Sequence, residues 1–295
     1  MARTVAGLPR GTRITDCISL GVRTKTFPMT TIETVLRESG RVSLRQRDLP
    51  AHVVVSYVIA LALDMQSSDR EVLRCLLEGL TWFLGPAATV KVAGKSGISQ
   101  ARTRLGWQVL QQLHDQVVPP IAVEATKGAW YRTWRLVSLD GSTLDVADET
   151  ENDQAFGRPS ASRGSRAFPQ LRFVSPVENG PPVLLGTRIG GVKTGEITLA
   201  KAVLPALRTG MLCLADRNFF GFALWNQARA TGADRRWSVK KNLRLPCEQR
   251  WPDGSYLSRV YASPKDQRHG KPGIVVRVSN TRSTGCLVPN PCPGC

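Results

Sequence analysis

The sequence predicts an α/β protein in which an all-helical N-terminal domain precedes a mixed β-sheet. Three observations support this fold class. Apolar residues recur at helical spacing over residues 28–125, and from residue 130 onward they gather in short runs typical of strands. The 295 residues are 42% hydrophobic and 21% charged, a balance typical of a globular chain with room for two domains.

Caps and helix breakers mark four helices in the first half of the chain. Gly40 is a C-cap signal after one periodic stretch, while Ser68 and Glu71 form a capping box ahead of another. Ser99 is expected to cap the last helix, which then ends before a Pro-Pro pair. The predicted helices cover residues 31–39, 50–63, 68–80 and 102–117.

The second half predicts the order strand, strand, strand, helix, strand, helix, strand. Asn179 and Gly180 signal a hairpin, so the first three strands are expected to form an antiparallel meander, whereas the later strands need crossovers. This is the ribonuclease H-like order, in which the first and fourth strands are neighbours. The predicted strands cover residues 135–140, 171–177, 182–189, 210–216 and 236–240, and the predicted helices cover residues 196–207 and 219–230.

Two aspartates, Asp140 and Asp216, each end a short apolar strand, the first and the fourth of this order. If those strands are neighbours, the two carboxylates lie side by side at one edge of the sheet. Converging carboxylates bind Mg²⁺, and such ions can activate the attacking oxygen and stabilise the leaving oxygen in phosphodiester cleavage. The alternative is that an Asp at a strand end only forms a turn, as Asp140 followed by Gly141 could do.

The charge of the chain favours an anionic partner. It has 40 Lys and Arg residues against 23 Asp and Glu residues, a formal net charge of +17. Such an excess favours nucleic acid or another anionic surface. A basic cluster after the fifth predicted strand is a candidate phosphate-contacting strip, with an ordinary solvated surface as the alternative. This cluster comprises Lys240, Lys241, Arg244 and Arg250.

No membrane or export signal stands out in the chain. The longest apolar run, residues 53–63, is about half of the roughly 20 residues that a membrane-spanning helix needs. Residues 1–27 are basic and poorly patterned, without the continuous apolar segment of a secretory signal, and are expected to form a flexible arm. We therefore expect a cytoplasmic, nucleoid-associated protein with no membrane partner.

Several sequence blocks occur in a fixed order along residues 28–276. Any one block alone would be weak evidence of a resemblance, but the ordered series is specific. The series resembles the DDE transposases of bacterial insertion sequences in the IS-four family. The blocks are LDGSTLDV at 139–146, FGRP at 156–159, FPQLR at 168–172, LADRNFFG at 214–221 and VKKNLRLP at 239–246.

This resemblance implies a nuclease and strand-transfer enzyme with a ribonuclease H-like catalytic domain over residues 130–276. Asp140 and Asp216 would be the first two of three metal-binding, catalytic carboxylates, with Mg²⁺ or Mn²⁺ as the cofactor. The partners would be double-stranded DNA, both the terminal inverted repeats and the target. The helical domain over residues 28–125 would bind DNA, and the enzyme would act as a homodimer on paired ends.

The third carboxylate of the family is a Glu in a Tyr-x2-Arg-x3-Glu-x6-Lys motif, and the sequence does not contain this motif. Residues 277–295 are instead an atypical tail, rich in Pro, Gly and Cys, that resembles an out-of-frame translation. We expect that a frameshift or truncation has left the catalytic domain incomplete, which would slow cleavage by orders of magnitude. Two hypotheses follow: a metal-dependent transposase, and a non-catalytic DNA-binding inhibitor derived from one.

Overall fold

The computed structural model describes residues 25–43, 49–64, 67–84, 94–160, 167–240, 243 and 245–279. The chain divides into two compact units, Met1–Val117 and Val118–Cys295, and each is described by itself. Most of the predicted arm (1–27) and most of the predicted tail (277–295) fall outside the described residues, so those two predictions remain predictions.

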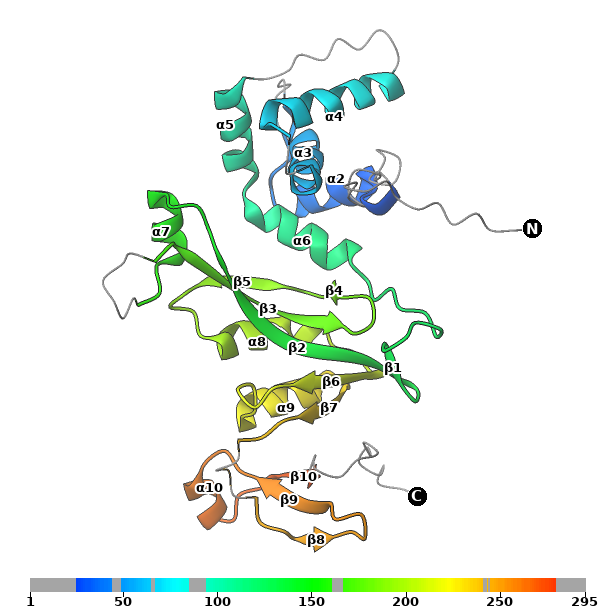
Figure 1. The fold of residues 1–295 in the computed structure, drawn as a ribbon, viewed down its shortest axis with the longest axis vertical. Helices are drawn as coiled ribbons and strands as arrows, with labels where there is room; N and C mark the ends of the chain where they lie inside the picture. The colour runs from blue at the N-terminus through cyan, green and yellow to red at the C-terminus, as the bar shows by residue number, and fades with distance from the viewer. Residues whose placement is uncertain are drawn as a thin grey trace, which may run out of the picture. The chain divides into compact units, whose positions relative to one another are not determined.

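The first unit is helical, as predicted (Figure 1). Its helices bury one apolar core, in which Val35, Tyr57, Leu73 and Val109 are almost completely shielded from solvent. The predicted cap at Ser68 is confirmed, because the Glu71 N–H donates to the Ser68 Oγ at 3.3 Å. The helices are α2 (Met29–Glu38), α3 (Ala51–Leu63), α4 (Asp69–Leu84), α5 (Lys95–Leu105) and α6 (Trp107–Val117).

The prediction of one helix over residues 102–117 is wrong. Two helices, α5 and α6, cover this region and are separated by Gly106. The φ angle of Gly106 is +73°, a conformation open to glycine but strained for other residues, so the helix ends there. Ser99 therefore lies inside α5 and does not cap a helix. No helix among the described residues is long and apolar enough to cross a membrane.

The second unit contains the predicted mixed sheet, with the strand order β4-β3-β2-β6-β7 (Figure 1). β2 runs antiparallel to β3 and parallel to β6, and β6 runs parallel to β7. Two short strands, β1 and β5, pair with β2 and β3 outside this path. The first and fourth predicted strands are therefore neighbours, which confirms the ribonuclease H-like order. The strands are β1 (Trp130–Tyr131), β2 (Trp134–Asp145), β3 (Gln170–Glu178), β4 (Val183–Leu184), β5 (Arg188–Gly191), β6 (Met211–Ala215) and β7 (Asp234–Trp237).

Two helices, α8 (Glu196–Val203) and α9 (Phe222–Ala230), supply the crossovers and cover one face of this sheet. Their apolar side chains share a core with alternate residues of the strands, which shows which face they cover. The core includes Val137, Leu139, Met211 and Cys213 from the strands and Leu199, Val203, Leu224 and Ala228 from the helices.

Several predicted boundaries are corrected by the structure. β2 extends five residues past Asp140, because β3 continues to pair with it as far as Asp145. The third predicted strand is split into β4 and β5 around Gly186, whose φ angle is +58°. The helix that begins at Glu196 ends at Val203 and is followed by a 3-10 turn at Leu204–Ala206. A short helix, α7 (Thr150–Phe156), was not predicted.

A second, three-stranded antiparallel sheet follows the mixed sheet in sequence, and it was not predicted either. Arg277 connects its parts: the guanidinium donates to Ser255 at 2.9 Å and to Asp253 at 2.7 Å, and it lies 4.5 Å from the centre of the Trp251 ring. The elements are β8 (Gln249–Arg250), β9 (Tyr256–Val260), α10 (Pro264–Arg268) and β10 (Ile274–Val278).

Candidate functional site

The two predicted aspartates follow a pair of residues that are in register on neighbouring parallel strands. Leu139 of β2 pairs with Ala215 of β6, and Asp140 and Asp216 come directly after them. Neighbouring strands lie about 4.8 Å apart, so residues in register are close together and share a face of the sheet. Both aspartates are exposed to solvent. The fold thus brings together the two residues that the sequence singled out.

The face that carries the aspartates lies opposite α8 and α9. Leu139 is buried in the core beneath those helices, and Ala215 packs against the same core. Because side chains alternate along a strand, the residue that follows each of them points to the other side of the sheet. Asp140 and Asp216 therefore point to the sheet face opposite α8 and α9.

The backbone around Asp140 explains how its carboxylate is held. The N–H of Arg135 donates at 2.9 Å to the Gly210 carbonyl, on the side of β2 that faces β6. Because backbone N–H groups alternate between the two sides of a strand, the N–H of Gly141, six residues later, points to this side as well. β6 has ended by then, and the Gly141 N–H donates at 2.8 Å to the Asp140 Oδ1. Gly141 lies inside β2, so the interpretation of Asp140 and Gly141 as a turn is wrong.

Asp216 is held in a similar way, at the start of a turn. The N–H of Arg217 donates to its Oδ1 at 2.6 Å, and the N–H of Phe219 donates to its backbone carbonyl at 3.0 Å. Phe219 is buried and anchors this turn in the core. Each aspartate thus receives one hydrogen bond from the residue that follows it. The second carboxylate oxygen of each aspartate has no hydrogen-bond partner within the described part of the chain.

The carboxylate of Glu196 approaches β2 from α8, at the residue that follows Asp140 and on the sheet face opposite the two aspartates. A Cβ atom built on Gly141 would lie 2.4 Å from the Glu196 Oε1 and 3.2 Å from the Val174 Cγ2. The Glu196 side chain therefore lies against the residue next to Asp140. The sequence had indicated Glu196 only as the first residue of a helix, because its approach to Gly141 depends on how α8 packs on the sheet.

The donor set suits a hard divalent cation. Mg²⁺ prefers oxygen ligands, keeps several waters, and is often held by one or two carboxylates together with substrate phosphates. Asp140 and Asp216 provide two such carboxylates, both accessible to solvent. Across the described ranges, no three His, Cys, Asp or Glu side chains gather closely enough to bind a metal by themselves.

The predicted basic cluster is only partly described. Lys240 is exposed and follows β7, whose last residue, Trp237, pairs with Ala215. The chain therefore leaves β7 at the end of the sheet where Asp216 lies. Arg250 is exposed in β8 of the separate small sheet, while Lys241 and Arg244 are outside the described residues. Arg217, exposed beside Asp216, is a basic residue that the sequence did not single out.

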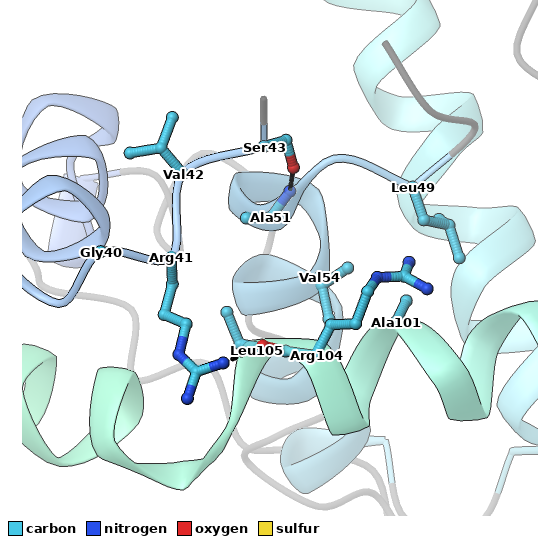
Figure 2. Close-up of a pocket in the computed structure, with 10 residues that line it drawn as sticks. All are labelled: Gly40, Arg41, Val42, Ser43, Leu49, Ala51, Val54, Ala101, Arg104 and Leu105. Atoms are coloured by element: carbon cyan, nitrogen blue, oxygen red, sulfur yellow. Dashed lines mark hydrogen bonds between the residues drawn. The ribbon is translucent and has the colours of Figure 1, made fainter. Parts of the chain in front are cut away.

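The helical unit has an open pocket of about 270 Å³ (Figure 2). Its shape depends on two hydrogen bonds: the Arg41 guanidinium donates to the Arg104 carbonyl at 3.0 Å, and the Ala51 N–H donates to the Ser43 Oγ at 2.9 Å. Among the described residues, the lining contains two arginines and no acidic residue. It comprises Gly40, Arg41, Val42, Ser43, Leu49, Ala51, Val54, Ala101, Arg104 and Leu105.

A helical unit is followed in this chain by a ribonuclease H-like sheet in which two aspartates lie close together, and two comparisons show which proteins the chain is similar to. Residues 17–115 match the family model described as the N-terminal part of the insertion element 4 transposase. Over 242 residues the chain is 25% identical to the transposase InsG for insertion sequence element IS4 of Escherichia coli (strain K12), which covers 80% of this chain and 52% of the relative. The chain is thus similar to IS4 transposases over both its helical unit and its mixed sheet. It spans about half the length of this curated relative.

Proposed function

We propose that the protein is a DNA transposase that cuts and joins DNA strands at the ends of an insertion sequence, with Asp140 and Asp216 as the metal-binding, catalytic carboxylates. The observation that carries this proposal is the register of β2 and β6. Two exposed aspartates directly follow the paired residues Leu139 and Ala215, in a chain that is similar to an IS4 transposase.

Each part of the site has a task in this reaction. A bound Mg²⁺ or Mn²⁺ would activate the attacking oxygen and stabilise the leaving oxygen of the phosphodiester. The chain supplies the position of that chemistry, because two neighbouring strands hold the carboxylates and the N–H groups of Gly141 and Arg217 orient one oxygen of each. Lys240 and Arg217 offer positive charge to the DNA phosphates at the same end of the sheet.

The DNA partner extends this proposal to the helical unit. The relative's name assigns it to insertion sequence element IS4, so the natural substrates here are the inverted repeats that flank the gene of this chain, together with a target duplex. The pocket around Arg41 and Arg104 presents two guanidinium groups, and its described lining residues include no acidic side chain, which suits a DNA phosphate. We further propose a homodimer on paired ends, acting on chromosomal DNA in the cytoplasm.

The test is metal-dependent nicking of a duplex that carries the inverted repeat, with a scrambled duplex as the DNA control. We expect Asp140→Asn and Asp216→Asn each to reduce nicking by a factor of at least about 100, because each removes a charged metal ligand. Both variants should still bind the repeat. Asp145→Asn is the matched control, since this exposed aspartate lies on β2 five residues beyond Asp140 and points to the other face.

The possible outcomes separate the two hypotheses. Nicking that depends on both aspartates supports the transposase. Specific binding of the repeat without nicking by the unaltered chain overturns catalysis and supports the non-catalytic DNA-binding inhibitor. Equal affinity for repeat and scrambled duplexes at matched salt overturns both, and leaves a general binder of nucleic acid.

A further inference from the structure

Helix α5 of the helical unit has one apolar face and one polar face. Ile98, Ala101 and Leu105 are buried in the core of the unit. Each residue turns an α-helix by about 100°, so positions i, i+3, i+4 and i+7 share one side of it. Four polar residues at this spacing lie opposite the buried ones, and all four are exposed: Ser96, Ser99, Gln100 and Thr103.

Helix capping does not explain these polar side chains. The N-cap residue of α5 is Gly94, and Ser99 lies in the middle of the helix, where serine is a weaker helix former than alanine. The Thr103 hydroxyl donates to the Ser99 carbonyl at 3.1 Å, so it is used within the helix. The side chains of Ser96, Ser99 and Gln100 form no hydrogen bond with other residues in the described ranges, and remain available to a ligand.

Cations border this polar face on both sides. By the same helical geometry, Lys95 and Arg102 lie along one border and Arg104 lies along the other. Arg102 is 3.7 Å from the Asp69 carboxylate, whereas Lys95 and Arg104 have no carboxylate partner among the described residues. Three other helices described for this unit, α2, α4 and α6, each contain acidic residues, and α3 contains no Lys or Arg. Among these helices, α5 alone combines cations with no carboxylate.

This arrangement is complementary to the major groove of duplex DNA. The groove is about 12 Å wide and admits an α-helix. Uncharged hydroxyl and amide groups in the middle of the exposed face can bond to base edges, and a glutamine can bond to both N6 and N7 of an adenine. Cations at the two borders can reach the phosphates of the two strands. Ser96 and Gln100 are about 6 Å apart along the helix axis, roughly two base-pair steps.

We propose that α5 reads the base sequence of the inverted repeat, with Ser96, Ser99 and Gln100 facing base edges in the major groove. Lys95 and Arg104 contact the phosphates on either side. This inference rests on the proposed function, which supplies the DNA but does not say which helix reads it. Arg104 joins the two, because it also lines the pocket proposed for a phosphate (Figure 2).

The experiment measures the affinity of the full 295-residue chain for two fluorescein-labelled duplexes at one salt concentration. One duplex carries the inverted repeat that flanks the gene of this chain, and the other carries the same bases in scrambled order. Gln100→Ala should weaken binding to the repeat about tenfold and leave binding to the scrambled duplex unchanged, because a base contact counts only where the correct base is present. Lys95→Ala should weaken binding to both duplexes alike, because a phosphate contact carries no sequence information.

A panel of repeats, each with one base pair replaced, locates the contact. The unaltered chain should lose affinity when the base pair read by Gln100 is replaced. Gln100→Ala should lose this discrimination at that base pair and keep it at the others. Ser99→Ala should relax discrimination at the same base pair or a neighbouring one, because Ser99 precedes Gln100 on the same face of α5.

A matched control makes the same chemical change on another helix of the unit. Gln112 is an exposed glutamine of α6, so Gln112→Ala should leave the affinity for both duplexes unchanged. Neither glutamine variant should lower the thermal midpoint, because each replaces an exposed side chain with a better helix former. A loss of affinity in Gln100→Ala therefore reports a contact with DNA and not a loss of folding.

Failure of this inference can be told apart from failure of the proposed function. If the unaltered chain prefers the repeat and both Gln100→Ala and Ser99→Ala keep the full preference, α5 does not read the sequence and the inference is overturned. The same holds if both variants lose affinity equally for the two duplexes. Nicking that depends on Asp140 would be unaffected by either result. If the unaltered chain binds the two duplexes equally, the specific DNA partner of the proposed function is overturned and the inference fails with it.

Discussion

Glu178, at the end of β3, forms an ion pair with Arg135, near the start of β2, and its side chain is completely buried. The carboxylate also accepts N–H groups from Ile121 at 2.8 Å and Ala122 at 3.2 Å, while Arg135 lies 4.6 Å from the centre of the Trp130 ring. This one carboxylate therefore attaches the first segment of the second unit to two strands of the mixed sheet.

Glu178→Ala should be among the most destabilising single changes in this sheet. It would leave Arg135 without its partner and two backbone N–H groups without an acceptor, which should lower the free energy of unfolding by about 3–5 kcal/mol. Urea denaturation followed by circular dichroism measures this loss. Glu149→Ala, at an exposed glutamate, is the control and should change stability by less than about 0.5 kcal/mol. A loss below about 1 kcal/mol for Glu178→Ala would show that the pair is dispensable.

Gly191→Ala should test why the stretch at 190–196 is rich in glycine. A Cβ atom on Gly191 would lie 2.4 Å from the Phe156 carbonyl oxygen and 2.9 Å from the Phe156 Cα, both backbone atoms that cannot turn aside. Such overpacking should cost about 3 kcal/mol in the free energy of unfolding. At Gly195 the nearest atom to a new Cβ is 3.7 Å away, so Gly195→Ala should cost clearly less. Equal losses would contradict a packing role for Gly191.

Lys240→Ala should weaken binding to repeat and random duplexes alike, because a phosphate contact carries no sequence information. The slope of log K against log salt concentration should fall by about 0.9, the value for one phosphate contact on duplex DNA. Fluorescence anisotropy over a range of salt concentrations measures this slope. Lys201→Ala, at an exposed lysine of α8, serves as the control. An unchanged slope for Lys240→Ala would place Lys240 away from the DNA.

Asp253 should give the small sheet a dependence on pH. Hydrogen bonds from Ser255, and then the Arg277 guanidinium, hold the pKa of this carboxyl below its usual range. A lowered pKa in the folded state means that the stabilisation is present above the unfolded pKa of about 3.9 and is lost as the pH falls through the folded value. Asp253→Asn should therefore destabilise the protein equally at pH 7 and pH 5, and the difference should shrink below about pH 4. Urea unfolding at pH 7, 5 and 3 measures it, and a difference at pH 3 that is as large as at pH 5 would contradict the assignment.

The sequence predicted the order of the mixed sheet because the signals involved are local. Gly180 has a φ angle of +92° in the turn after β3, which is the conformation that an Asn-Gly pair favours. The apolar runs before Asp140 and Asp216 became neighbouring strands because a short chain of alternating strands and helices has few ways to bury them.

What the sequence did not predict depends on contacts between distant residues. The approach of Glu196 to Gly141 joins positions that are far apart in the chain, and no local pattern encodes it. The break at Gly106 was missed because apolar periodicity continues on both sides of it. The small sheet was missed because its buried positions include Ser255 and Ser258, which interrupt the apolar alternation that normally indicates strands.

The parallel pairing of β2 and β6 has a consequence for the order of events during synthesis. A parallel neighbour cannot be reached by a tight turn, so the chain must pass through β3, β5 and α8 before Ala215 can lie beside Leu139. Pairing of this kind closes a long loop and is slow compared with local folding. A nascent chain on the ribosome therefore has no aspartate pair until this crossover is complete.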